Sequence, residues 1–174
     1  VCSLILTLYV LDELQYDAFH EDAENIYRIG FEGSLQGKKI KSAYIGVPVG
    51  PALQRATPAV ASTLRMASWK TFPMRYRDKA FTEPHLLLAD SNFFTFFSFQ
   101  LLEGNPDEVL RGEHALVISE SAARRYFDYK GKGDITPIGK EMTLAQGYKA
   151  TVKGIAADPP SNSHFHFTII LSLN

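Results

Sequence analysis

The order of hydrophobic and polar residues changes sharply near the start of the chain. The first residues, VCSLILTLYVL, are apolar except for Ser3 and Thr7, and the acidic residues Asp12 and Glu13 follow directly. A helix of this apolar length is about 16 Å long, roughly half the ~30 Å thickness of a bilayer core. The pattern predicts the outer half of a transmembrane helix, with a buried core helix as the alternative. The acidic exit favours an extracytoplasmic flank, because cytoplasmic flanks usually carry Lys or Arg.

In the rest of the chain, stretches whose apolar residues recur every second position, as in strands, alternate with stretches that have the 3.6-residue period of helices. Tyr27, Ile29 and Phe31 alternate with polar residues and predict a strand that forms a hairpin with a second strand near 39–47. Apolar runs bounded by Gly, Pro and charged residues predict further strands within 61–69, 73–77, 86–89, 114–119 and 163–173, and two strands within 140–157 around a turn at Gln146-Gly147. Helical spacing predicts short helices after Pro51, over 91–98 and 105–111, and over 120–127 with Ser119 as its cap.

The stretch ADSNFFTFFSF is rich in phenylalanine. Asp90 or Ser91 is a natural cap, and Phe93, Phe96 and Phe97 follow at helical spacing. Such a cluster is more typical of a core than of a ligand-binding box, so we interpret these rings as core residues.

Composition narrows the classes of function. The 174 residues are 45% hydrophobic, which is ordinary for one folded domain or two small lobes. Lys and Arg together number 18 against 19 acidic residues, so charge gives no reason to expect nucleic acid as a partner. Cys2 is the only cysteine, which excludes an internal disulfide and a zinc site with several thiolates.

Sequence motifs for enzymatic chemistry are missing. The chain contains no G-x-x-x-x-G-K-S/T phosphate loop, no G-x-G-x-x-G and no G-x-S-x-G. HEDAE at residues 20–24 begins like the zinc-protease motif H-E-x-x-H but has Glu24 in place of the second histidine. No set of acid, base and nucleophile converges in the sequence, so we predict neither an enzyme nor a cofactor.

The best remaining candidate for a site is DPPSNSHFHF at residues 158–167. If the stretch after the prolines is a strand, its alternate side chains point to opposite faces. One face would then hold His164, His166, Thr168 and Ser172, and the other Phe165, Phe167, Ile169 and Leu171. Two imidazoles side by side are metal candidates, but zinc needs three or four protein ligands. We therefore interpret His164 and His166 as polar surface, and a metal site as the weaker alternative.

A structural role fits this stretch better than a metal site. Asp158, Pro159 and Pro160 form a rigid turn, since consecutive prolines fix the backbone and end the preceding strand. The turn and Asn162 lead into Phe165 and Phe167, which we expect to anchor the returning strand in the core.

Several stretches, taken in order, resemble one known family. They are YDAFHEDAENIYRI, GPALQRATP, DSNFFTFFSFQLLEGNPDEVL, LVISESAARRYF, TPIGKEM and VKGIAADPPSNSHFHF. Together they resemble the MacB-like periplasmic core domain of FtsX-type ABC transporter permeases, in the form common in Bacteroidetes. The resemblance implies an α+β fold of two lobes after a membrane helix and stalk at 1–19. A βαβ porter-like lobe would comprise 20–68 and 160–174, and an inserted mixed α/β lobe would comprise 69–159.

The same resemblance implies a function and a location. The domain would be non-catalytic, would face the periplasm at the inner membrane, and would couple ATP-driven helix movement to substrate export or to an envelope partner. Its partners would be a second permease subunit, a cytoplasmic ABC ATPase, and an adaptor or lipoprotein. The alternative is a soluble periplasmic domain that binds a peptide or metal with the His164/His166 face. The chain departs from the family in the longer loop FDYKGKGDITPIGK and in stopping at Asn174, where the closing part of the first lobe would be missing.

Overall fold

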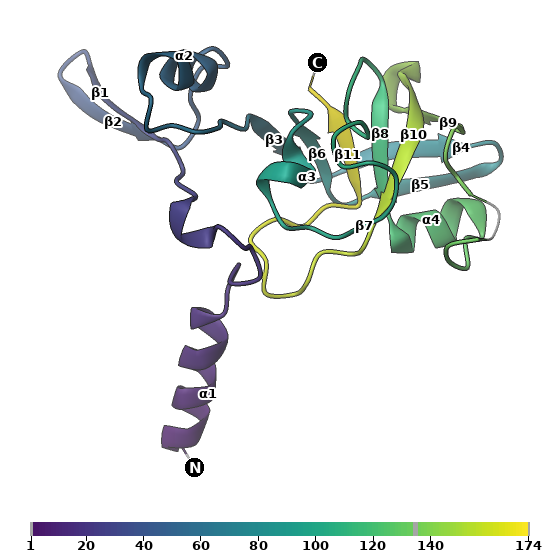
Figure 1. Ribbon diagram of the computed structural model, residues 1–174, viewed down its shortest axis with the longest axis horizontal. Coiled ribbons are helices and arrows are strands. Elements are labelled where there is room, and N and C mark those ends of the chain that lie inside the picture. Colours follow the sequence, from purple (N-terminus) through teal and green to yellow (C-terminus); the bar gives the residue numbers. More distant parts are fainter. Residues whose placement is uncertain (1, 134–135, 174) are drawn as a thin grey trace.

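The computed structural model describes residues 2–133 and 136–173. Its largest element is a nine-stranded mixed sheet with the strand order β3-β6-β11-β8-β10-β9-β4-β5, in which β7 also pairs with β10 (Figure 1). The strands are β3 (Met66–Trp69), β4 (Phe72–Tyr76), β5 (Lys79–Glu83), β6 (Leu86–Ala89), β7 (Leu101–Glu103), β8 (Ala115–Ser119), β9 (Glu141–Leu144), β10 (Lys149–Ala156) and β11 (Ile169–Ser172).

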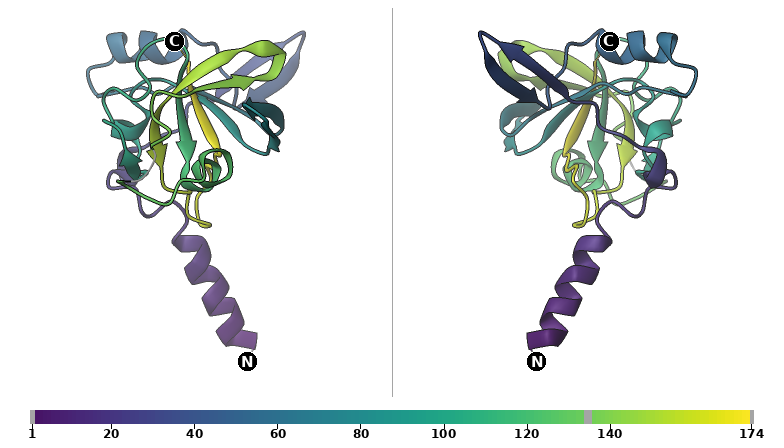
Figure 2. Two further views of the ribbon diagram at one scale, coloured as in Figure 1. Left: turned by 90° about the vertical axis from the view of Figure 1, so that its right-hand side faces the viewer. Right: turned by 90° about the vertical axis from the view of Figure 1, so that its left-hand side faces the viewer.

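Helix α1 (Cys2–Leu14) leaves the body of the molecule as a stalk, and the N-terminus lies at its far end (Figure 2). Its apolar side chains, from Leu4 to Leu11, are about half or more exposed, because no other described part of the chain packs against them. Within residues 2–133 and 136–173, no helix has both the length and the hydropathy that crossing a bilayer requires.

The core lies on both faces of the sheet. Strand β8 is buried along its whole length: Leu116 and Ile118 point to one face and Val117 to the other, as strand geometry requires. Helix α4 (Glu120–Phe127) covers the first face through Ala122, Ala123 and Tyr126. The short helix α3 (Phe93–Phe96) and its neighbours cover the second face. Phe93, Phe94, Phe97 and Phe99 are all buried, which confirms the interpretation of this stretch as core.

The part of the sequence between the stalk and β3 forms a hairpin and a helix, which lie to one side of the sheet (Figure 1). Strands β1 (Phe31–Leu35) and β2 (Lys38–Ser42) form the expected hairpin, but its strands are shorter and shifted relative to our prediction. Gln36 and Gly37 both have positive φ and make a two-residue turn, which fixes the register. The Ser42 hydroxyl accepts a hydrogen bond from the Tyr44 N–H and turns the chain away from the ladder. Helix α2 (Val49–Ala56) follows, as predicted.

One predicted local element is wrong, and two strands, β5 and β7, were not predicted. Residues 105–111 form successive turns in place of a helix, because the Asn105 side chain accepts from the Asp107 N–H and the chain bends to seat Val109 against Gly104 and Gly154. Strand β5 was not predicted at all, and it pairs with β4 after a tight turn at Arg77, which has positive φ.

The boundaries between the two expected lobes stay a prediction. Strand β11, which we assigned to the first lobe, pairs with β6 and β8 of the second. Strand β3 spans the expected boundary and pairs with β6. Residues from both expected lobes therefore share one hydrogen-bonded sheet.

Candidate functional site

The segment after α1 is held by the loop that precedes β11. Asp17 has a left-handed backbone with φ of 55°, and its N–H donates to the Asn162 carbonyl at 2.9 Å. The Asn162 side-chain amide donates in return to the Gln15 carbonyl at 3.0 Å. Figure 1 shows the yellow loop of residues 157–168 beside the purple segment that leaves the stalk. We call the contacts of residues 15–21 with 162–164 and 97–99 the stalk joint.

The Asp17 carboxylate and His164 form the centre of the stalk joint. Oδ1 of Asp17 accepts from the His164 backbone N–H at 3.0 Å, and Oδ2 lies 2.6 Å from Nδ1 of the imidazole. Burial alone would raise the pKa of Asp17, but the hydrogen bonds from His164 and Ser163 hold it below its ordinary value. Tyr16 packs its ring edge against the imidazole at 4.5 Å between centroids. The carboxylate therefore stays ionised and paired at neutral pH.

His20 anchors the other end of the stalk joint in the core. Its Nδ1 accepts a hydrogen bond from the Ser98 N–H at 3.2 Å, and the Glu21 N–H donates to the Ser98 hydroxyl at 2.9 Å. The ring is 5% exposed and lies among Phe19, Phe97 and Phe99. Because Nδ1 is an acceptor, the imidazole is neutral, and burial lowers its pKa below the ordinary value.

The loop that holds the stalk continues directly into the middle of the sheet. Phe167 is buried between the rings of Phe93 and Phe99, and Phe165 is half-buried against Phe97. The Thr168 carbonyl then accepts from the Ser119 N–H, and β11 runs between β6 and β8. A short covalent path thus joins the stalk joint to a central strand.

Asp158 fixes the other end of this loop to α4. Its Oδ1 accepts from the Ser121 hydroxyl at 2.7 Å and from the Ser121 N–H at 3.3 Å, at the positive end of the helix. Ser119 caps the same helix through the Ala122 N–H, as predicted. Pro159 and Pro160 lie between these two attachments, so the loop has fixed ends.

The predicted strand through the two histidines is wrong in its extent. The Thr168 N–H donates to the His85 carbonyl, and strand pairing begins only at Ile169. Phe167 packs on one face of the sheet, whereas Ile169 and Leu171 pack on the other, so the four apolar residues do not share a face. His164 and His166 lie on the irregular segment before the strand, where His164 is bound to Asp17. In the part of the chain that the structure describes, no three His, Cys, Asp or Glu side chains form a metal-binding group.

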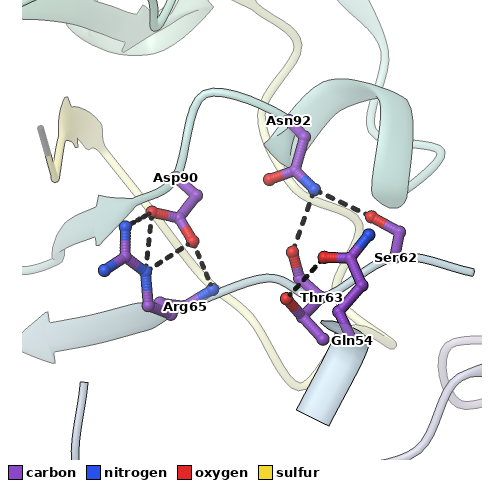
Figure 3. Close-up of polar contacts among 6 residues, drawn as sticks. All are labelled: Gln54, Ser62, Thr63, Arg65, Asp90 and Asn92. Carbon is purple, nitrogen blue, oxygen red and sulfur yellow. Dashed lines mark hydrogen bonds and ion pairs between the residues drawn. The ribbon is translucent and has the colours of Figure 1, made fainter. Parts of the chain in front are cut away.

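A second set of polar contacts joins the segment after α2 to the sheet (Figure 3). The Arg65 guanidinium binds both oxygens of Asp90, at 2.7 Å from Nη2 and 2.9 Å from Nε, and the Arg65 backbone N–H donates to the same carboxylate. The hydrogen bonds that the guanidinium donates to the Asp90 carboxylate raise the pKa of Arg65. We predicted Asp90 or Ser91 as the cap of α3, but Asn92 precedes the helix and Asp90 pairs with Arg65 instead.

Asn92 extends this second set toward α2. Its side-chain amide donates to the Ser62 hydroxyl and to the Thr63 carbonyl, both at 3.1 Å, while the Thr63 hydroxyl donates to Gln54 of α2 (Figure 3). We call the contacts of Gln54, Ser62, Thr63, Arg65, Asp90 and Asn92 the α2 joint. No sequence signal pairs Arg65 with Asp90, because the two residues are 25 positions apart.

The fold of this chain is similar to that of domains of known structure. A domain of a putative permease protein from Porphyromonas gingivalis is 27% identical, with a TM-score of 0.65, over 78% of this chain and 56% of that chain. The periplasmic region of MacB from Actinobacillus actinomycetemcomitans is 19% identical, with a TM-score of 0.57, over 87% of this chain and 68% of that chain. The mixed sheet is thus the fold of these two domains, and the predicted α+β class is confirmed.

The family follows from the sequence match. Residues 1–174 match the MacB-like periplasmic core domain family, and the chain belongs to it, which confirms the resemblance. The chain spans 56% of the length of the Porphyromonas gingivalis structure. No curated protein matches the chain.

Proposed function

We propose that this domain passes movement of a membrane helix into a periplasmic sheet, as part of an FtsX-type ABC permease subunit at the inner membrane. The observation that carries the proposal is the stalk joint. Asp17 lies three residues beyond the end of α1. It contacts Asn162 and His164 in the loop before β11, and its contacts with His164 span 147 positions of sequence.

Two routes lead from α1 into the domain. The covalent chain runs through the 3₁₀ turn Ala23–Asn25 to the exposed hairpin β1–β2, which packs few of its side chains. The stalk joint runs to Phe167 and β11 in the most buried part of the sheet. A displacement of α1 is transmitted by the stiffer route, because close-packed interiors transmit strain. The sheet therefore follows the stalk.

The domain has no catalytic role or cofactor in this proposal. The sequence carries no phosphate loop, so ATP hydrolysis belongs to a separate cytoplasmic ABC ATPase. A second permease subunit, forming a dimer, and a periplasmic adaptor or lipoprotein are the remaining partners. The alternative of a peptide- or metal-binding His164/His166 face is less well supported, since the imidazole of His164 lies within the stalk joint.

The test uses the full-length permease with its ATPase in lipid nanodiscs. Spin labels on the two domains of the dimer report their separation with and without trapped ATP. We expect the separation to change with nucleotide in the natural protein. In an Asp17→Ala/Asn162→Ala variant the change should shrink, although ATP hydrolysis continues. The variant removes the side-chain hydrogen bonds of Asp17 with His164 and of Asn162 with Gln15, and leaves the contacts of His20 and Glu21 with Ser98.

A control variant distinguishes the effect of losing contacts of the stalk joint from the effect of losing a negative charge. Glu24→Ala removes an exposed acidic side chain from the same linker. Within the described chain this side chain forms no hydrogen bond or ion pair, so the variant should keep the full nucleotide response. If the double variant also keeps the full response, the stalk joint does not carry the movement and the proposal fails.

A further inference from the structure

The histidine at the inner end of the stalk joint makes only half of its possible hydrogen bonds. Nδ1 of His20 accepts from the Ser98 N–H at 3.2 Å, so the proton of the neutral ring is on Nε2. Within the described chain this buried Nε2 has no hydrogen-bond partner. A buried polar group without a partner destabilises the folded chain, because it has lost its hydrogen bond to water. The position of the ring therefore depends on one hydrogen bond and on packing.

Three aromatic rings surround the imidazole. Those of Phe19, Phe97 and Phe99 lie with their centroids 4.1, 5.0 and 5.1 Å from its own. A second proton on the imidazole would be on Nδ1, which could then no longer accept from the Ser98 N–H. The two N–H groups would face each other among apolar side chains, and the ring would carry a charge that burial disfavours. Protonation thus removes the hydrogen bond and adds a repulsion.

The charged groups near His20 do not compensate for its burial. Burial lowers the pKa of His20, and the charge of Asp17 opposes this effect less strongly. Both carboxylate oxygens of Asp17 already bind His164, at the backbone N–H and at Nδ1. Glu21 is exposed, and its backbone N–H, not its carboxylate, is bound in the stalk joint. Residues 93–99, which pack against the ring from the side of α3, include no titratable side chain. The described surroundings of the ring thus favour its neutral form.

The two ends of the stalk joint respond to protons in opposite ways. At the outer end, Nδ1 of His164 lies 2.6 Å from the ionised Asp17 carboxylate, so a proton on this imidazole turns the contact into an ion pair. At the inner end, a proton on His20 removes the hydrogen bond with Ser98. Acid therefore strengthens the outer end and weakens the inner end.

We propose that the inner end of the stalk joint, formed by residues 19–21 and 97–99, is an acid-sensitive latch. When His20 takes up a proton, the two segments separate, while Asp17 keeps its contacts with Asn162 and His164. The stalk is then held by the loop before β11 and no longer by the phenylalanine rings beside α3. The consequence for transmission of movement rests on the proposed function: with the latch open, the sheet follows α1 less closely. The opening itself does not depend on that function.

Hydrogen exchange in the full-length permease, without nucleotide, measures the latch directly. Mass spectrometry with fragmentation to single residues follows the Ser98 and His164 amides, and the rates are corrected for the intrinsic effect of pH on exchange. Because the lowered pKa means that the open latch binds the proton more readily, closure weakens as pH falls. Protection of the Ser98 amide should decrease by up to about ten-fold between about pH 6.5 and 5.5. Protection of the His164 amide, which Asp17 holds, should not decrease.

Two variants separate the latch from a general effect of acid. In His20→Asn the amide oxygen can accept from the Ser98 N–H as Nδ1 does, but the side chain does not titrate. The Ser98 amide of this variant should have the same protection at both pH values. His166→Gln removes an exposed histidine outside the stalk joint and is the matched control, so it should keep the natural pH response. Thermal melting checks that both variants are folded, and the two amides of the natural protein give the comparison if His20→Asn is not.

Three results would overturn the proposal: no change of Ser98 protection with pH in the natural protein, the same change in His20→Asn, or an equal loss at the His164 amide, which would indicate general opening by acid. The proposed function is tested separately, by the nucleotide response at neutral pH, where the latch is closed. If that response is absent but the Ser98 amide responds to acid, the proposed function is wrong and the latch remains.

Discussion

Replacing Asp90 with alanine removes the acceptor at the centre of the α2 joint. The carboxylate takes hydrogen bonds from Nε, Nη2 and the backbone N–H of Arg65, and its side chain is 16% exposed against 32% for Arg65. Hydrogen bonds to charged groups contribute about 1.5–3 kcal/mol each, and breaking a fully buried pair costs about 3–5 kcal/mol. Because the freed guanidinium still reaches water, we expect a loss of about 2–3 kcal/mol of unfolding free energy.

Equilibrium urea denaturation and thermal melting measure this loss. For a chain of this size each kcal/mol lowers the melting temperature by about 2–4 °C, so a decrease of roughly 5–10 °C is expected. Arg65→Ala should cost less, since the backbone N–H of residue 65 keeps its bond to Asp90. Glu141→Ala is the control. It breaks an ion pair with Lys149 in which both side chains are more than half exposed, and such pairs contribute about 0–1 kcal/mol. Equal losses in Asp90→Ala and Glu141→Ala would refute the reasoning.

Three further predictions concern the cap of α4, the packing under Val109 and the pH response of the stalk joint. Ser119→Ala should lower the unfolding free energy by about 1 kcal/mol in urea titrations, because the Ala122 N–H loses its acceptor. Gly104→Ala should destabilise far more than Gly112→Ala in thermal melts: both residues have positive φ, but only at Gly104 would a Cβ meet Val109, at 2.4 Å. The pKa of His20 is lowered in the fold, so the unfolded chain binds the proton more readily. Stability should therefore decline as pH falls below about 6.5, and the slope should flatten in His20→Gln.

Helices and strands that are determined by residues close together in the sequence can be predicted from the sequence. The run ALVIS is apolar on both faces and becomes the buried strand β8, and Ser119 stands where a helix cap is needed. Strand β5 was missed because KAFTE has a charged residue at each end and a polar face, so no apolar run marks it.

The two joints could not be predicted in the same way. Asp17 and His164 lie 147 positions apart, and Arg65 and Asp90 lie 25 apart. Each pair depends on how strands are ordered in the sheet, and one sequence does not specify that order. The sequence from Asp158 to Phe167 predicted a structural role for this stretch. It did not predict that the stretch would contact residues 15–17 after the stalk, because no periodic pattern in either segment indicates the other.

The central claim is that α1 and the sheet move as one body through the stalk joint. Spin labels at Leu14→Cys, at the end of α1, and at Lys153→Cys, an exposed site on β10, measure this in the full-length permease with every natural cysteine, Cys2 included, replaced by serine. Pulsed electron paramagnetic resonance should give one narrow distance distribution that is the same with and without trapped ATP, and it should broaden when Asp17→Ala and Asn162→Ala are introduced. A distribution that shifts or broadens with nucleotide in the natural protein would contradict the account.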